Sequence, residues 1–184
     1  FKENPIGHNA KLKIAKISYD QGDFEWAQAQ LDVLKASTSK LISNDAMDLS
    51  LLITDNYNID TSDVPMKTFA YADMLLYQKK YKESIIKYDS ILMYFPGHSL
   101  TDEIYMRKAD IYLHLDSINS ALKMYKKIEE EWSYDILADE ALYMQASIYD
   151  NKLNKPEMAM NFYEKIVLNY QGSIYASEAR NRFR

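Results

Sequence analysis

The feature that most limits how this 184-residue chain can fold is an internal repeat. A small residue recurs at intervals of 37 and then 38 positions, and a tyrosine four positions after it keeps both intervals. These positions are Ser84, Ala121 and Ala159 for the small residue, and Tyr88, Tyr125 and Tyr163 for the tyrosine. A repeat of this length is typical of chains that stack one supersecondary unit on the next.

Each copy is expected to form a hairpin of two helices. Another small residue precedes the first one by 12 or 13 positions, where it lets the two helices approach closely. An upstream copy has Leu31 in place of the tyrosine. The paired small residues are Ala15 and Ala27, Ala72 and Ser84, Ala109 and Ala121, and Ala146 and Ala159. Since one hairpin cannot bury its apolar face alone, we expect neighbours to stack. A generic amphipathic bundle, the alternative, requires this register to recur by chance.

The composition favours a helical, folded chain. Four glycines and four prolines argue against turn-rich β architectures and glycine-rich phosphate loops. With 27 acidic and 22 basic residues, the net charge is −5, so we expect no nucleic-acid partner. The chain has no cysteine, which excludes disulfides, a thiol nucleophile and cysteine-bound metals. No window approaches the run of about 18 uncharged apolar residues of a transmembrane helix, so we expect no direct membrane insertion.

These residues resemble the tetratricopeptide repeat (TPR) family. The match is most complete at Ala72, Ser84, Tyr88 and Pro96. They correspond to the family's small residue of the first helix, the alanine of the second helix, the aromatic residue after it and the closing proline. The resemblance implies an all-α fold, a right-handed α-solenoid of stacked antiparallel helical hairpins with about nine to ten helices.

The copies also depart from the family pattern. Their periods exceed the usual 34 residues, the third copy lacks the closing proline, and the fourth has Gln171 there. The turn between the helices of the last copy is one residue longer than in the others. This degenerate, Tyr-rich style resembles TPR proteins of bacterial cell envelopes, among them outer-membrane assembly lipoproteins. That likeness implies a periplasmic or outer-membrane-associated location, with a cytoplasmic one left open.

We expect a single solenoid domain over residues 1–184. Because the chain starts without methionine and ends inside a predicted helix, we interpret it as part of a longer protein. The expected segments are repeats at 9–39, 65–97, 101–133 and 138–172, an extra helix and loop at 40–63, and a capping helix at 173–184. The segment 40–63 is interpreted equally well as half of a degenerate repeat.

Few residues offer catalytic or metal-binding chemistry. The histidines are His8, His98 and His114. Asp110 and His114 lie four positions apart on one helix face, a spacing that can hold a metal, but no third ligand is evident nearby. No Gly-x-Ser-x-Gly motif is present. We therefore expect no cofactor, no metal and no enzymatic activity, with a metal-dependent enzyme as the remote alternative.

In TPR arrays the first helices of the hairpins line a concave groove where extended peptides or partner helices dock. The resemblance therefore implies a groove that is acidic, with aromatic and methionine anchors. Such a groove suits a protein or peptide with basic and apolar residues. The implied groove residues are Lys16, Tyr19, Asp20, Phe69, Asp73, Leu76, Tyr77, Glu103, Met106, Asp110, Leu113, His114, Glu140, Tyr143 and Asp150.

The function implied is a non-catalytic protein–protein interaction scaffold within a larger bacterial envelope protein. A structural spacer or self-association module is the alternative, and homo-oligomerisation goes with it. A groove that is only hydrated, or that further repeats cover, is also left open.

Overall fold

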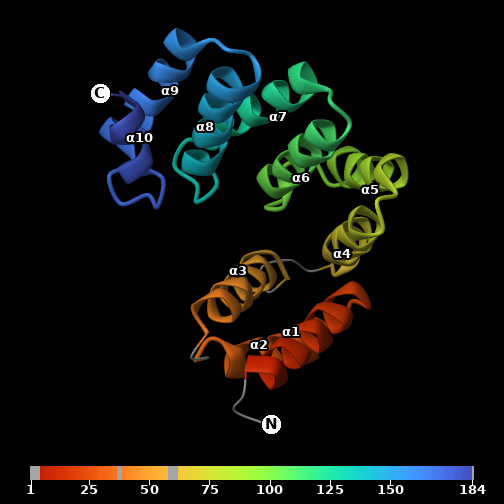
Figure 1. Cartoon of the computed structure of the whole chain (residues 1–184). Helices are drawn as coiled ribbons and strands as arrows, with labels where there is room; N and C mark the ends of the chain where they lie inside the picture. The colour runs from red at the N-terminus through yellow and green to blue at the C-terminus, as the bar shows by residue number, and fades with distance from the viewer. Residues whose placement is uncertain (1–4, 37–38, 58–61, 184) are drawn as a thin grey trace. The chain divides into compact units, whose positions relative to one another are not determined.

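The computed structural model describes residues 5–36, 39–57 and 62–183, and the chain is helical throughout these ranges (Figure 1). Ten α-helices and one short π-helical segment are present in them. The all-α class and the expected number of helices are therefore confirmed. None of the described helices is long and apolar enough to cross a membrane.

The helices follow the predicted hairpins closely. In chain order they are α1 (Pro5–Asp20), α2 (Phe24–Leu34), α3 (Lys40–Tyr57), α4 (Val64–Tyr77), α5 (Tyr81–Tyr94), α6 (Thr101–His114), α7 (Ile118–Glu131), α8 (Ala138–Ser147), the π-helical segment η1 (Ile148–Lys152), α9 (Pro156–Asn169) and α10 (Ala176–Phe183). The first helix begins four residues before the start predicted at residue 9, so His8 lies inside α1. Both predicted segments outside the hairpins, α3 and α10, are helical.

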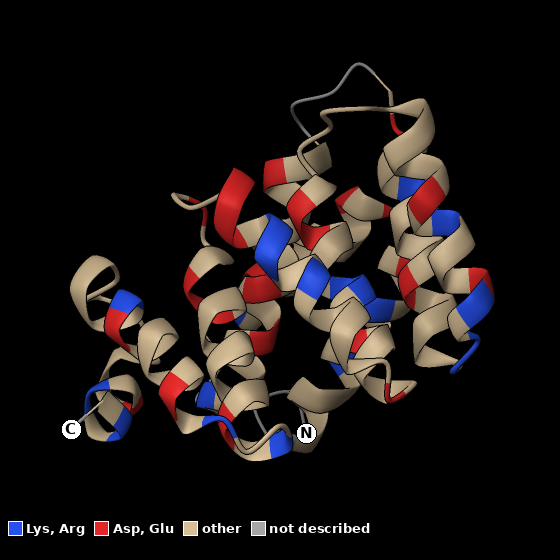
Figure 2. Cartoon of the chain, turned by 90° about the horizontal axis from the view of Figure 1, so that it is seen from above, with Lys and Arg blue, Asp and Glu red and all other residues tan. Residues whose placement is uncertain are grey.

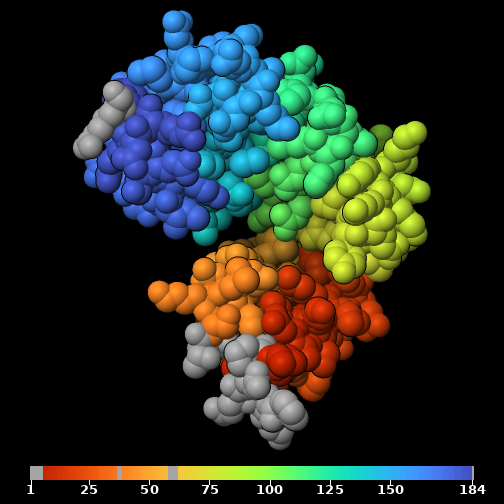
Figure 3. All heavy atoms as spheres, viewed as in Figure 1, coloured from red at the N-terminus to blue at the C-terminus, as the bar shows by residue number. Residues whose placement is uncertain are grey.

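The chain divides into two compact units, which we call the N-terminal unit (residues 1–100) and the C-terminal unit (residues 101–184). In the N-terminal unit, α1 pairs with α2, α3 packs on α2 and α1, and the α4–α5 hairpin contacts α1 through α4. In the C-terminal unit, every helix from α6 to α10 packs on the next one along the chain. The space-filling view shows one face of each unit, with the helices coloured in chain order (Figure 3).

The core lies at the positions that the repeat predicts. All eight paired small residues of the four hairpins are buried, and so are Leu31, Tyr88, Tyr125 and Tyr163. The Ser84 hydroxyl donates a hydrogen bond of 2.9 Å to the Ala72 carbonyl, which joins the two small positions of one hairpin directly. Small residues thus let the helices touch, and the large residue four positions later fills the space beside them.

The turn inside each hairpin uses one residue in the left-handed conformation. It is Gly22, Lys79, Asp116 or Asn154, with φ between 51° and 78°. After α1, α4 and α6, the next residue donates its N–H to a carbonyl five positions back, for example Asp23 to Ser18 at 2.9 Å. This Schellman pattern satisfies the last carbonyls of the helix and sends the chain back antiparallel.

The extra residue of the last hairpin is absorbed by η1. Its five residues, Ile148–Lys152, are wound as π-helix, in which hydrogen bonds span one residue more than in an α-helix. Beyond it, the Lys155 N–H donates to the Tyr149 carbonyl, six positions back instead of five. The insertion therefore leaves the register of both small residues intact, and Ala146 and Ala159 are both buried.

Candidate functional site

In the N-terminal unit the predicted groove positions of α1 and α4 come together around Asp73. The Tyr19 hydroxyl donates to Asp73 Oδ2 at 3.0 Å, and the Tyr88 hydroxyl donates to Asp73 Oδ1. One tyrosine comes from α1 and the other from α5, so the carboxylate is held by both neighbouring helices. Two hydroxyl donors therefore fix the position of the Asp73 carboxyl group on this face.

Asp20 lies beside this carboxyl group. Burial and, to a smaller extent, the charge of Asp73 raise the pKa of the Asp20 carboxyl to about 6, and Lys16 opposes the rise. The Lys16 ammonium also pairs with Asp45 of α3, with Nζ 3.4 Å from Oδ2. Lys16 thus acts on the Asp20 carboxyl while it also pairs with Asp45.

Apolar side chains border the pair. Leu76 is half-buried, and the Tyr77 ring is 89% exposed at the end of α4. We call Asp20, Asp73, Leu76 and Tyr77 the α1–α4 surface. It combines two neighbouring carboxyl groups with accessible apolar area, which is the composition of a surface for a basic, partly apolar partner.

Three predicted groove residues are core residues instead. The exposed fractions of Tyr19, Phe69 and Met106 are 3%, 0% and 4%, so they cannot act as surface anchors. The Phe69 ring packs on the Tyr88 ring of its own hairpin, with centroids 5.3 Å apart. Met106 packs in the same cluster as Tyr125. The prediction assigned every residue on one side of each first helix to the groove. Phe69 and Met106, at the edge of that side, instead pack against the second helix of their own hairpin.

In the C-terminal unit, α6 repeats the carboxylate–tyrosine contact. The Tyr125 hydroxyl donates to Asp110 Oδ1 at 3.2 Å, just as Tyr88 donates to Asp73, and each pair is fifteen positions apart in its own hairpin. Burial raises the pKa of Asp110, and Arg107, the Tyr125 hydrogen bond and His114 counteract the rise. Of the other predicted positions on α6, Glu103 and Leu113 are half-buried and His114 is exposed.

The last predicted set, on α8 and η1, contacts α10. The Tyr143 ring stacks on the Tyr175 ring just before α10, with centroids 4.4 Å apart. Burial raises the pKa of Tyr175 to about 12, and Glu140 adds to this through its charge and a hydrogen bond. Asp150 Oδ2 accepts from Arg182 Nη1 at 3.1 Å. The acidic face of α8 and η1 therefore already holds an arginine from α10.

Metal-binding geometry is not found at the predicted pair. Among the described residues, no group of three or more His, Asp or Glu side chains is placed to hold a metal ion. Asp110 bonds to Tyr125, and His98 accepts the Leu100 N–H at Nδ1 (3.0 Å), a contact that shapes the turn before α6.

The lysine clusters lie on solvated faces. Lys79, Lys80 and Lys82 are exposed, and Lys126 pairs with Glu130 one turn on, at 3.1 Å. Basic positions (Lys and Arg) and acidic positions (Asp and Glu) are interspersed along the helices of both units (Figure 2). Exposed pairs of this kind contribute little to stability.

The structure thus brings the predicted residues into three local sets: the α1–α4 surface, the outer face of α6, and the face of α8 and η1 that α10 contacts. The sequence analysis did not include Tyr88 and Tyr125 among the site residues. Their recurrence fifteen positions after Asp73 and Asp110 is nevertheless visible in the sequence. No protein-family model matches the chain, and no curated protein matches it with significant similarity.

Proposed function

We propose that this chain is a non-catalytic protein-interaction module of the TPR type, part of a larger bacterial envelope protein. Its α1–α4 surface binds a partner segment that carries basic and apolar side chains. The hairpins, with small residues at the crossings and a large residue between them, support the family assignment. The partner chemistry rests on charge and exposure at the α1–α4 surface.

One observation carries the choice of a basic partner. Within the C-terminal unit, the acidic residue Asp150 of the corresponding predicted set pairs with Arg182 of α10 at 3.1 Å. The α1–α4 surface has the same acidic character, but there the charge of Asp73 acts on Asp20 and raises its pKa. A guanidinium or ammonium group from a partner offsets that repulsion as Arg182 does for Asp150.

Photo-crosslinking in cells tests the location. A benzophenone side chain at Tyr77 of the full-length protein is expected to crosslink a discrete protein, because the tyrosine is exposed beside the acidic pair. The matched control carries the same group at Tyr134, which is fully exposed on the α7–α8 loop. Equal crosslinking from both positions contradicts a partner site at the α1–α4 surface.

The identified partner then allows a test of charge. Because Asp20 titrates near pH 6, its carboxylate attracts a basic partner at pH 7.5 and is mostly neutral at pH 5. We expect about tenfold weaker binding at pH 5, and a flat profile in Asp20→Asn. Asp73 is a poor target for the first test because its removal breaks two tyrosine hydrogen bonds. Binding that keeps its pH dependence in Asp20→Asn argues against this site.

A further inference from the structure

A pocket of about 310 Å³ lies between α2 and α3, in the N-terminal unit. Phe24 and Ile53 form its buried apolar floor, and the Tyr57 ring packs on the Phe24 ring with centroids 4.8 Å apart. Glu25, Gln28 and Asp32 supply the polar part of the lining. We call this the α2–α3 pocket. It shares no residue with the α1–α4 surface, so its chemistry is independent of the proposed function.

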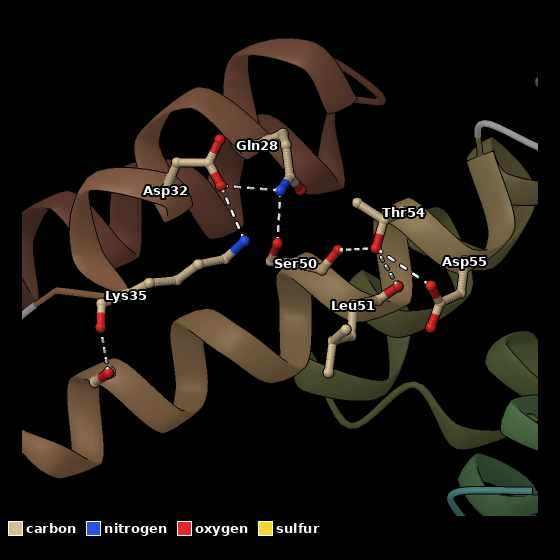
Figure 4. A network of polar contacts seen from close by, with 8 residues as sticks. Gln28, Asp32, Lys35, Ser50, Leu51, Thr54 and Asp55 are labelled. Carbon is tan, nitrogen blue, oxygen red and sulfur yellow. Dashed lines mark hydrogen bonds and ion pairs between the residues drawn. The ribbon is translucent and has the colours of Figure 1, made fainter.

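The polar groups of the pocket are mostly acceptors. Gln28 Nε2 donates to Asp32 Oδ1 at 3.2 Å and to Ser50 Oγ at 2.5 Å (Figure 4). A carboxylate can only accept, so the amide nitrogen must face Asp32, and the amide oxygen faces away from it. Gln28 Oε1 is buried and accepts no hydrogen bond from any described residue. An unsatisfied buried acceptor is destabilising, and a donor in the pocket relieves it.

The negative charge of the pocket is only partly offset. Lys35 Nζ lies 2.9 Å from Asp32 Oδ1, on the same helix end (Figure 4). The ammonium group of Lys67 pairs with Asp63, with Nζ 2.5 Å from Oδ2. Glu25 is exposed at the rim and forms no ion pair with another described residue. Lys35 therefore offsets Asp32, while the Glu25 carboxylate and Gln28 Oε1 form no ion pair or hydrogen bond with a cationic side chain among the described residues.

We propose that the α2–α3 pocket binds a guanidinium group carried on an aliphatic chain. Its planar fork of N–H donors can serve the Asp32 carboxylate and Gln28 Oε1 together, while its face stacks on the Tyr57 ring. The terminal torsion of glutamine is soft, so rotation can turn Oε1 towards such a donor; this breaks the Nε2 hydrogen bonds to Asp32 and Ser50, and the guanidinium replaces the one to Asp32. The aliphatic chain covers Phe24 and Ile53. An arginine side chain of a protein segment and a free small guanidine share this chemistry.

The direct test is an NMR titration of the whole chain, labelled at glutamine side-chain amides and isoleucine methyls. The probe is N-acetyl-arginine methylamide, and the neutral isostere N-acetyl-citrulline methylamide is the matched ligand control. We expect saturable shifts of the Gln28 amide and the Ile53 methyl with arginine, and affinity at least about tenfold lower with citrulline. Equal affinity of both probes, or no shift at Gln28 and Ile53, overturns the proposal.

Two variants locate the binding energy. Gln28→Met keeps the length of the side chain and removes the acceptor, and Glu25→Gln removes a rim charge without touching the core. Each is expected to weaken the arginine probe about threefold to tenfold. Glu83→Gln, in the first turn of α5 as Glu25 is in the first turn of α2, is the matched control and leaves affinity unchanged. Unchanged affinity in both Glu25→Gln and Gln28→Met refutes the site. If Gln28→Met is poorly folded, unchanged affinity in Glu25→Gln alone refutes it.

A comparison of ligands identifies the source of the guanidinium. Ethylguanidinium binding as tightly as an arginine-containing pentapeptide assigns the pocket to small cations, and at least about tenfold tighter peptide binding assigns it to a protein segment. The double variant Asp20→Asn/Tyr77→Ala separates this site from the α1–α4 surface. It is expected to leave the arginine titration unchanged whether or not the proposed partner binds.

Discussion

The two units are built from the same hairpin, yet they differ in how one hairpin connects to the next. In the C-terminal unit, each helix from α6 to α10 packs on its successor, and the copies recur after 38 residues. In the N-terminal unit, α3 packs on α2, and the next hairpin returns to contact α1. The same core positions are buried in both units. The hairpin is therefore the local unit of structure, and the units differ in the presence of α3 between two hairpins.

The acidic faces differ as well. At Asp150 of the C-terminal unit, α10 brings Arg182 to the carboxylate. At Asp20 of the N-terminal unit, α4 brings a second carboxylate, Asp73, which raises the pKa of Asp20 in addition to the larger effect of burial. An arginine thus faces the carboxylate at Asp150, whereas a second carboxyl group adds to the negative charge at Asp20. This difference is the reason to look for a partner at the α1–α4 surface.

The largest effect is expected from removing the large buried residue of one hairpin, which tests whether the two units unfold separately. Tyr125→Ala should lower the free energy of unfolding by about 4 kcal/mol, because it empties the space beside Ala121 and also breaks the Asp110 contact. Hydrogen exchange read by mass spectrometry should then show faster exchange mainly over residues 101–183. Tyr88→Ala makes the corresponding change in the N-terminal unit and should increase hydrogen exchange mainly over residues 5–57 and 62–100.

Equal loss of protection across the chain in both variants would show that the two units unfold together. The control is Tyr134→Ala, since this ring is fully exposed on the α7–α8 loop and its removal should change neither unit measurably.

The core was predictable because its positions depend on local periodicity. Ala109, Ala121 and Tyr125 lie within one hairpin, and helical spacing alone brings them together. The faces were harder to predict. Phe69 and Asp73 lie one turn apart on α4, and the slight rotation of the helix that buries one and half-exposes the other is set by packing on α5.

Contacts between distant segments were not predictable from the sequence. Asp150 and Arg182 are 32 positions apart and meet only because α10 packs on α9. The α2–α3 pocket likewise needs α3 to lie along α2, and no spacing rule links Gln28 to Ser50. The extra residue near Ile148 was visible as a longer interval, but its conversion into π-helix was not.

A smaller change isolates the tyrosine hydroxyls. Tyr125→Phe should lower the free energy of unfolding at pH 7 by about 1 to 2 kcal/mol, the usual value for a hydrogen bond to a charged group. It also removes a contact that lowers the pKa of Asp110, so that pKa should rise further. The difference in stability should vanish at pH values where Asp110 is protonated in both folded and unfolded chains. Carbon-13 NMR titration of the Asp110 carboxyl measures the shift.

Tyr88→Phe sharpens the comparison, because Asp73 keeps the hydroxyl of Tyr19. Tyr88→Phe should therefore lower the free energy of unfolding by only about 1 kcal/mol. The double variant Tyr19→Phe/Tyr88→Phe should lower it by more than the sum of the two single variants. Strict additivity in this double-mutant cycle contradicts a shared carboxylate.

The raised pKa of Asp20 predicts that its contribution to the free energy of unfolding depends on pH. Its folded pKa, about 6, exceeds the ordinary value of 3.8, so the folded chain holds a proton that the unfolded chain loses between these values. Stability from this group is therefore lost as the pH rises from about 4 to 6. Asp20→Asn should gain about 1 kcal/mol at pH 7 and nothing at pH 4, a figure reduced because Asp20 is partly exposed.

Urea unfolding at both pH values measures this gain. Glu164→Gln, an exposed acid on α9, is the control and should be neutral at each pH. A gain in Asp20→Asn that is the same at pH 4 and pH 7 speaks against titration of this carboxyl in the folded chain.

The smallest changes in the free energy of unfolding are expected in the turns of the four hairpins, because each turn uses one residue with positive φ in both units. Lys79, Asp116 and Asn154 adopt positive φ, which costs a residue with a Cβ atom up to about 1 kcal/mol relative to glycine. Lys79→Gly should raise the free energy of unfolding by about 0.5 to 1 kcal/mol. Asp116→Gly and Asn154→Gly should gain less, because Asp and Asn tolerate this conformation best.

The reverse change tests the same turn from the other side. At Gly22, a Cβ atom would lie 3.0 Å from Cγ of Lys67, a flexible side chain that can yield, so the strain of Gly22→Ala comes mainly from its φ of 78°. We expect a loss of about 1 kcal/mol in denaturant unfolding. If Lys79→Gly destabilises the chain while Gly22→Ala also does, the turns are not equivalent. The shared hairpin would then hold for the core but not for the turn that closes it.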